Sequence, residues 1–332
     1  MSVVYIKEQG AVVQKRSERI LVSHSGKTLA EIPMYNIESI AVIGNVQITT
    51  QALFSLMKNG IDINYFTFSG KYLGCTAAEI SKNIFLRLAQ YDIYQDMGKR
   101  LEIARNIVAN KIKNQISLVQ RHRWDPEDDL WKDEVKQMEM LINKVQYAES
   151  TNQLMGIEGK ASNIYFKSFG RMFKCKFEFR GRNRRPPKDP INVMISLGYT
   201  FLTKEVSSAL EAESFEMYLG FLHGIRYGRK SLPLDIVEEF RQPVIDRMVI
   251  KLFNKSMIQE FDFTFEEDRV ILNEGGFLKF CKEFEYWMTD SNYSGKGQNF
   301  RSCIREQVKS LKDFVQKKGE YQPFCISGNK NT

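Results

Sequence analysis

The spacing of the hydrophobic residues changes once along the chain, near residue 80. Before that point they form short runs rich in β-branched and aromatic residues, a pattern that predicts strands. We expect these strands over residues 3–6, 11–14, 20–23, 28–32, 39–43 and 63–68. One helix should interrupt them near residues 49–58, with Thr49 or Thr50 as its N-cap. Residues 1–80 are therefore expected to form a small β-rich domain that resembles a β-sandwich.

After residue 80 the hydrophobic residues recur every three or four positions, as on one face of a helix. Helices are expected over much of 80–116 and near 129–148, 151–169, 190–210, 213–221, 235–253, 277–288 and 298–317. Five of the eight prolines fall between residues 186 and 243, which predicts interrupted helices there. The expected fold class is α+β, with a larger all-α domain over residues 81–332. The chain from Tyr321 onward is expected to fray.

Composition narrows the class of protein. The 332 residues are 43% hydrophobic and 27% charged, which excludes a largely disordered or collagen-like chain. Five widely spaced cysteines without a CxxC pair argue against a disulfide framework and against a structural zinc site. The N-terminus lacks the pattern of a signal peptide, and no apolar run approaches the length of a membrane span. We expect a soluble cytoplasmic protein with no membrane partner.

The excess of positive charge is concentrated in one segment. The net charge is +8, and between Gly156 and Lys188 ten basic residues stand against two acidic ones. Aromatic residues alternate with these charges, which is typical of a surface that binds the phosphate backbone of a nucleic acid. The basic residues that we select as candidate DNA contacts are Lys160, Arg171, Lys174, Arg182, Arg184 and Arg185. A solvated loop or an acidic protein partner would account for the charge equally well.

One histidine is followed by carboxylates at a suggestive spacing. His223 precedes Asp235 and Glu238, which lie three residues apart and so share one face of a predicted helix. Glu158 is one of the two acids in the basic segment. A histidine with carboxylates and no thiolate suits Mg²⁺ or Mn²⁺. The alternative is that the acids complement a helix dipole or balance nearby cations, and that the histidine is structural.

Three ordered segments carry a family resemblance. They are GIEGKASNIYF at 156–166, NRRPPKDPINVMISLGYTFL at 183–202 and GFLHGIRYGRKSLPLDIVEEFRQPVIDR at 220–247. In this order they resemble the signature blocks of the first CRISPR-associated protein family, the integrase-endonucleases that insert new spacers into CRISPR arrays. The segment GNVQITTQALFSLMKNGIDINYF at 44–66 is similar to the N-terminal domain of that family.

The resemblance implies a metal site and supporting residues. The implied metal ligands, which are also the catalytic residues, are Glu158, His223 and Glu238. Many relatives carry Asp at the last of these positions, so Glu238 adds one methylene. Asp235 is implied as a neighbour or alternative ligand of the metal, Arg241 as an organiser of its loop, and Tyr165 as an aromatic residue near the reacting phosphate.

The resemblance also implies a reaction and partners. The 3′-hydroxyl of a prespacer duplex attacks a phosphodiester of the CRISPR repeat, and hydrolysis is the same reaction with water as the nucleophile. The implied partners are double-stranded and branched DNA, a second copy bound through the β-domain, and a small ferredoxin-like adaptation protein that bridges two such dimers. Two alternatives stay open. One is a non-catalytic basic DNA-binding scaffold, and the other is an unrelated metal-dependent RNA nuclease.

Overall fold

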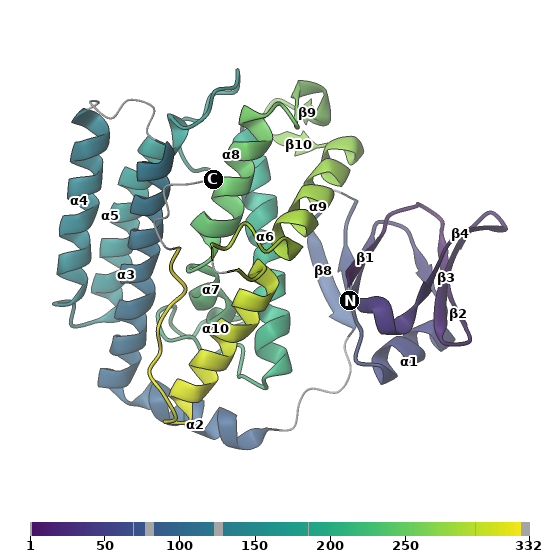
Figure 1. Ribbon diagram of the computed structural model, residues 1–332, viewed down its shortest axis with the longest axis horizontal. Helices are drawn as coiled ribbons and strands as arrows, with labels where there is room; N and C mark the ends of the chain where they lie inside the picture. Colours follow the sequence, from purple (N-terminus) through teal and green to yellow (C-terminus); the bar gives the residue numbers. More distant parts are fainter. Residues whose placement is uncertain are drawn as a thin grey trace. The chain divides into compact units, whose positions relative to one another are not determined.

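The computed structural model describes most of the chain as two compact units (Figure 1). The described residues are 2–68, 70–76, 83–122, 129–184, 186–295 and 297–326. The first unit is Met1–Ile80 with Asn273–Phe277, and the second is Ser81–Leu272 with Leu278–Thr332. The first is rich in strands and the second in helices, so the predicted α+β fold class is confirmed.

The N-terminal unit contains two four-stranded sheets. One has the order β1–β5–β7–β8, with strands Ser2–Ile6, Ile37–Ile43, Asp62–Phe66 and Tyr72–Thr76. The other has the order β4–β3–β2–β6, with strands Lys27–Pro33, Arg19–His24, Val12–Arg16 and Gln47–Ile48. A short 3₁₀ turn, η1 (Met34–Asn36), precedes β5. The short strands β6 and β8 were not expected from the sequence.

Buried residues from both sheets form one hydrophobic core in this unit. Ile40 of the central strand β5 pairs in parallel register with Ile63 of β7, and both are fully buried. Val13 of the other sheet joins the same core. Helix α1 (Thr50–Lys58) adds Leu56, and the side chain of Thr49 caps the helix by accepting a hydrogen bond from the amide of Ala52. The expected helix and its N-cap are therefore confirmed.

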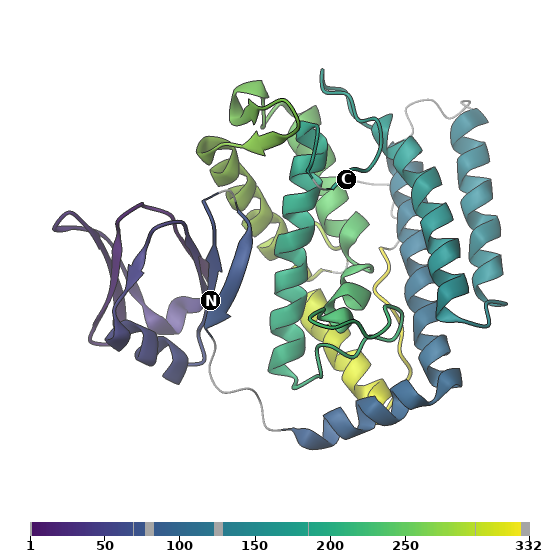
Figure 2. The ribbon, with the colours of Figure 1, turned by 180° about the vertical axis from the view of Figure 1, so that it is seen from behind.

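The second unit is mainly helical. Its longer helices are α2 (Ile84–Gln95), α3 (Met97–His122), α4 (Asp129–Val145), α5 (Thr151–Gly170), α6 (Pro190–Ala212), α10 (Phe300–Val315) and, from Leu278 onward, α9 (Glu274–Thr289). Figures 1 and 2 show α3, α4 and α5 side by side. A 3₁₀ turn, η3 (Glu260–Asp262), leads into an antiparallel hairpin of β9 (Phe263–Phe265) and β10 (Val270–Leu272). This hairpin adds two short strands that the sequence pattern did not indicate.

Two helices expected from the sequence are replaced by other structure. Residues 213–221 form turns, because Ser214 adopts a positive φ of 75° directly after α6 and ends the helix. The single helix expected near 235–253 is divided into α7 (Ser231–Val237), a π-helical turn η2 (Arg241–Asp246) and α8 (Arg247–Asn254). Pro243 lies in the π-helical turn, where a residue without an amide hydrogen interrupts the regular bonding of an α-helix.

The expectation that the chain frays from Tyr321 is wrong for residues 321–326. The carboxylate of Glu239 accepts hydrogen bonds from the hydroxyl of Tyr321 and, at 2.8 Å, from the amide of Phe324. The ring of Phe324 also stacks on Phe240, with a centroid separation of 4.7 Å. Residues 327–332 lie outside the described part of the chain.

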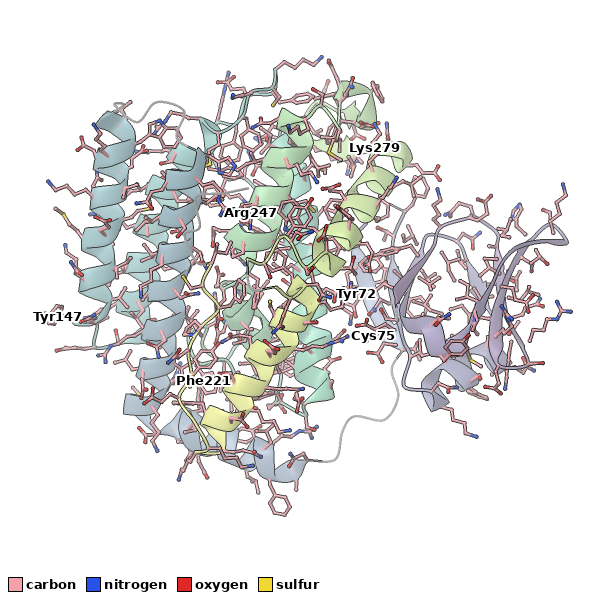
Figure 3. The ribbon with its side chains drawn as sticks, in the orientation of Figure 1. Tyr72, Cys75, Tyr147, Phe221, Arg247 and Lys279 are labelled. Carbon is pink, nitrogen blue, oxygen red and sulfur yellow. The ribbon has the colours of Figure 1, made fainter. Side chains whose placement is uncertain are left out.

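Aromatic side chains of the helical unit range from fully buried to largely exposed. Figure 3 shows the labelled Phe221, which is fully buried, and Tyr147, which is 81% exposed at the turn between α4 and α5.

Among the described residues, no helix combines the length and apolar content needed to cross a membrane.

A buried carboxylate connects α5, α6 and η2. Asp246 accepts hydrogen bonds from the hydroxyl of Tyr165 at 2.6 Å and from that of Tyr199 at 2.8 Å. All three side chains are buried. Burial raises the pKa of Asp246 to about 6, although the two hydroxyls and the guanidinium groups of Arg241 and Arg182 act in the opposite direction.

The raised pKa of Asp246 predicts a pH-dependent stability. Because it lies above the ordinary value of 3.8, the folded state binds this proton more tightly than the unfolded state. The resulting stabilisation is complete below about pH 4 and is lost as the pH rises through about 6. The Asp246→Asn variant should therefore gain about 3 kcal/mol relative to the natural protein between pH 4 and pH 7. Urea unfolding of both proteins across this range tests this, and a constant difference would contradict it.

Helix α6 passes η2 so closely that one position has no room for a side chain. A Cβ atom at Gly198 would lie 2.5 Å from Cγ2 of Ile245. Gly156 on α5 provides a contrast, because no described atom lies within 4 Å of a Cβ built there.

These two glycines predict opposite responses to alanine. Gly198→Ala should destabilise the protein, because the steric cost of about 1–3 kcal/mol exceeds the gain in helix propensity. Gly156→Ala should stabilise it by up to about 1 kcal/mol, since only the helix propensity changes. Chemical denaturation of both variants checks the signs, and an equal effect at the two positions would show that the contact with Ile245 is unimportant.

Candidate active site

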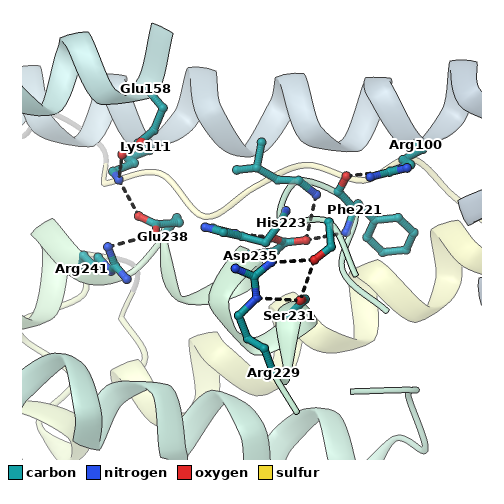
Figure 4. Close-up of polar contacts among 12 residues, drawn as sticks. Arg100, Lys111, Glu158, Phe221, His223, Arg229, Ser231, Asp235, Glu238 and Arg241 are labelled. Carbon is teal, nitrogen blue, oxygen red and sulfur yellow. Dashed lines mark hydrogen bonds and ion pairs between the residues drawn. The ribbon is translucent and has the colours of Figure 1, made fainter. Parts of the chain in front are cut away.

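Helix α3 buries a lysine between two acids. The side chain of Lys111 is 6% exposed, and its ammonium group forms ion pairs with Oε1 of Glu158 and, at 2.6 Å, with Oε2 of Glu238 (Figure 4). Glu158 lies on α5, and Glu238 directly follows α7. The structure therefore brings together two of the three predicted metal ligands, which are 80 residues apart in the sequence, around one cationic group.

Glu238 is held as a carboxylate by two cations. Its other oxygen, Oε1, lies 2.9 Å from Nη1 of Arg241. Burial acts to raise the pKa of Glu238, but the charges of Arg241 and Lys111 outweigh burial and lower it to about 2. Oε2 accepts no well-aligned hydrogen bond from any described residue, although the Lys111 ammonium lies close to it. The contact with Lys111 is thus an ion pair without the alignment of a good hydrogen bond.

The third predicted ligand is oriented by Asp235. Nδ1 of His223 lies 2.7 Å from Oδ1 of Asp235, which is fully buried. With the Nδ1 hydrogen donated to Asp235, Nε2 of His223 carries the free lone pair. Burial acts to lower the pKa of His223, but the hydrogen bond and charge of Asp235, together with the charge of Glu238, raise it overall.

Asp235 also shapes the loop that carries His223. The backbone amides of Phe221, Leu222 and His223 donate hydrogen bonds to its carboxylate at 2.5, 2.9 and 2.9 Å. A Cβ atom at Gly220 would lie 2.9 Å from Oδ2 of Asp235, so the loop requires glycine there.

Further contacts fix both ends of the same loop (Figure 4). Arg229 donates a hydrogen bond of 2.6 Å to the carbonyl of Gly224, and Ser231 donates one of 3.1 Å to the same oxygen. Nε of Arg100, on α3, donates to the carbonyl of Phe221 at 3.1 Å. The imidazole of His223 is therefore mounted on a loop that is bonded to both α3 and α7.

Glu158 faces a basic cavity. Its side chain is 25% exposed, against 5% for Glu238, and its Oε1 accepts a hydrogen bond of 2.8 Å from Ser162. The cavity has a volume of about 870 Å³. The basic residues that line it are Lys111, Lys167, Arg180, Arg182, Arg184 and Arg241. A polyanion entering this cavity would meet Glu158 within a field of positive charge.

Several buried polar atoms belong to residues that line this cavity. Four of these atoms have no hydrogen-bond partner among the described residues: Gln115 Oε1, Arg182 Nε, Arg241 Nε and Gln242 Oε1. Burial lowers the pKa of Arg182 to about 10, so its guanidinium remains charged at neutral pH. The cavity wall thus contains buried donors and acceptors that no described residue satisfies.

The predicted DNA contacts fall into different environments. Arg182 and Arg184 line the basic cavity, whereas Lys160 is exposed on α5 outside its lining. Arg171 forms a two-point ion pair with Glu134 and packs over Trp131, with its guanidinium 4.4 Å from the ring centroid.

Two further candidates lie away from the cavity lining. Lys174 lines a second cavity of about 700 Å³ among aromatic residues. Arg185 lies outside the described residues.

The supporting residues implied by the resemblance are also found in different places. Asp235 contacts His223 directly, and Arg241 contacts Glu238. Tyr165 is fully buried, and its hydroxyl donates to Asp246, so its side chain does not reach the surface.

Lys111 was missed in the sequence. It stands between Val108 and Ile112, at a position that helical spacing assigns to the buried face of α3. A lysine on such a face requires an acidic partner, and this was the available signal.

The carboxylate oxygens and the imidazole nitrogen at this site are the types of ligand that bind a divalent metal. Glu158 and Glu238 share one cation, Glu238 Oε2 is a buried oxygen without a well-aligned donor, and His223 presents Nε2. Within the described part of the chain, however, no three histidine, cysteine, aspartate or glutamate side chains are grouped closely enough to hold a metal ion. In this arrangement an ammonium group lies between the two glutamates.

Known proteins share both the sequence and the fold. The family model "CRISPR associated protein Cas1" matches residues 4–286. A CRISPR-associated endonuclease Cas1 of Thermus thermophilus is 30% identical, over 98% of this chain and 98% of the relative. A CAS1 protein from Thermotoga maritima superimposes with a TM-score of 0.84 at 27% identity, covering 96% of this chain and 99% of that one.

A more distant structure shares the fold alone. It is a casposase bound to an integration product, with a TM-score of 0.83 at 22% identity, covering 99% of this chain and 94% of the casposase. The match to the family model and the relative that aligns along nearly the whole chain confirm the resemblance seen in the sequence. The protein belongs to the Cas1 family of CRISPR-associated endonucleases.

Proposed function

We propose that the protein is the integrase of CRISPR adaptation, a divalent-metal-dependent DNA endonuclease that joins the 3′-hydroxyl ends of a prespacer to the CRISPR repeat. The convergence of Glu158 and Glu238 on one cation, beside a cavity lined with arginine and lysine, carries this proposal. The endonuclease name of the relatives and the shared fold of a casposase bound to an integration product agree with it.

Glu158, His223 and Glu238 would hold the metal. Carboxylate oxygens suit Mg²⁺ and Mn²⁺, and the imidazole tilts the preference modestly toward Mn²⁺. When bound, such an ion lowers the pKa of the attacking hydroxyl or water and stabilises the charge that develops on the reacting phosphate.

The other residues of the site orient ligands and bind substrate. Asp235 holds the imidazole of His223 in one tautomer, and Arg241 keeps Glu238 ionised. Arg182 and Arg184 contact phosphate oxygens without regard to base sequence, which suits an enzyme that accepts many prespacers. Little acid–base chemistry is required of the protein, since positioning and electrostatics dominate phosphoryl transfer.

The reaction requires more than one copy of the chain. Each chain provides one site, and both ends of a prespacer must be joined, one to each strand of the repeat. We therefore expect a homodimer formed through residues 1–80 and a small ferredoxin-like adaptation partner that bridges two dimers on double-stranded and branched DNA. A chromosomal CRISPR array as substrate locates the reaction in the prokaryotic cytoplasm.

The second candidate function is a non-catalytic DNA scaffold. One observation favours it, because Lys111 already neutralises Glu158 and Glu238 as a purely structural ion pair would. Such a scaffold would bind DNA in a salt-sensitive manner without making or breaking bonds.

Strand transfer tests the choice between these functions. Labelled prespacer and supercoiled plasmid with a repeat are incubated with the protein in Mg²⁺ or Mn²⁺, with an EDTA control. Changing a residue that only supports a metal ligand lowers metal affinity or activity by about 10–100-fold. Glu158 is a proposed ligand itself, so Glu158→Gln should lower joining by at least about 100-fold and leave duplex binding nearly unchanged. Glu139→Gln, which neutralises an exposed acid on α4, is the matched control.

The possible outcomes separate the candidates. Full joining by Glu158→Gln would refute the assigned site. Duplex binding without joining or cutting under any metal or partner condition would support the scaffold. Cleavage of RNA with no action on branched DNA would support an RNA nuclease.

Salt dependence tests which arginines contact DNA. Arg184 is exposed and lines the cavity, so Arg184→Gln should reduce the slope of log affinity against log salt by about 1. Arg171 is neutralised by Glu134, so Arg171→Gln should leave the slope unchanged. Fluorescence anisotropy with a labelled duplex at several salt concentrations measures both. Equal slopes for the two variants would contradict the assignment of Arg184.

A further inference from the structure

Lys111 combines burial with contacts to two expected metal ligands. Its ammonium group lies between Glu158 on α5 and Glu238 after α7. Burying a lysine costs several kcal/mol unless the charge is paired, so this placement depends on both acids. On the same helix, Asn114 donates a hydrogen bond of 3.0 Å to the carbonyl of Glu239, which fixes α3 against the segment that carries Glu238.

We propose that Lys111 and the divalent metal are alternative occupants of the space between Glu158 and Glu238. Without metal, the ammonium group holds the two carboxylates together, and metal binding displaces it. This inference rests on the proposed function, because it takes Glu158 and Glu238 as metal ligands.

The oxygen atoms that face Lys111 are the ones a metal would need. Oε1 of Glu238 is engaged by Arg241, which leaves Oε2 directed at the ammonium group. On the other side, Oε1 of Glu158 contacts the same ammonium group. One oxygen from each acid therefore points to a single cation position. Two carboxylates so placed would repel each other if no cation lay between them.

The lysine also accounts for the open arrangement of the ligands. Among the described residues no three potential ligands are close enough together to hold a metal, and the ammonium group of Lys111 lies between Glu158 and Glu238. Closure around a metal therefore requires Lys111 to leave. A lysine side chain is flexible, and Lys111 lines the basic cavity of about 870 Å³. The displaced ammonium group has space there and would add a positive charge where phosphate is bound.

Competition of this kind weakens the apparent metal affinity. If most molecules have Lys111 between the acids, the apparent dissociation constant rises in inverse proportion to the fraction that is free to bind metal. Removing the ammonium group should therefore tighten metal binding. A purely structural ion pair predicts the opposite, because its loss would disturb the two acids and weaken any site they form.

Direct measurement of Mn²⁺ binding tests the proposal without an activity assay. Calorimetric or electron paramagnetic resonance titration of the full chain should show at least about tenfold tighter binding for Lys111→Met than for the natural protein. Lys113→Met is the matched control, since it removes an equal charge from an exposed position two residues along α3. It should bind Mn²⁺ like the natural protein.

A second variant covers the case in which Lys111→Met does not fold without metal. Lys111→Gln keeps a hydrogen-bond donor between the acids and should also bind Mn²⁺ more tightly. In both variants, Mn²⁺ should raise the melting temperature by more than it does in the natural protein, because tighter binding to the folded state stabilises it further.

The outcomes distinguish this inference from the proposed function. If neither Lys111 variant binds Mn²⁺ more tightly, the competition is refuted, while loss of Mn²⁺ binding and strand transfer in Glu158→Gln would leave the integrase function intact. If Glu158→Gln binds Mn²⁺ as well as the natural protein does, the ligand assignment fails and this inference fails with it. Tighter binding by both Lys111 variants, abolished by adding Glu158→Gln, establishes the competition.

Discussion

Charge compensation in the interior organises the helical unit. Four charged side chains alternate in sign along a chain of ion pairs, in the order Glu158, Lys111, Glu238 and Arg241. They come from α5, from α3 and from the segment after α7. An uncompensated charge in such a place costs several kcal/mol, so each group depends on its neighbours. Because the groups come from different elements, the ion pairs also determine how those elements pack. The same ion pairs therefore position the side chains of the site and hold the helices that carry them together.

Two carboxylates three residues apart are compensated in different ways. Asp235 accepts hydrogen bonds from three backbone amides and the imidazole of His223, all from one loop. Glu238 is compensated by two side-chain cations, Lys111 and Arg241. Backbone donors cannot leave without unfolding the loop, whereas a side-chain cation can be exchanged for another one. The rigid carboxylate thus orients a ligand, and the exchangeable one remains available to bind.

The sequence indicated the residues that lie in short ordered segments and missed those that depend on distant contacts. His223, Asp235 and Glu238 lie in one segment whose order resembles a family signature, and that resemblance, with the three-residue spacing of Asp235 and Glu238, made them candidates. Lys111 was not identified, because helical periodicity reports which face is buried and does not report what that face contacts. The C-terminal residues were misjudged for the same reason. Their hydrogen bonds to Glu239 join positions more than eighty residues apart, and local composition carries no sign of them.

The C-terminal segment has a consequence for how the molecule is made. Tyr321 and Phe324 donate hydrogen bonds to Glu239, the residue directly after Glu238. A ribosome synthesises Glu238 long before it reaches Tyr321, so a nascent chain has these acids without the groups that cover them. This part of the interior can be completed only after Phe324 has been synthesised. The release of residues 321–324 from the ribosome therefore sets the earliest moment at which the nascent chain can acquire its native centre.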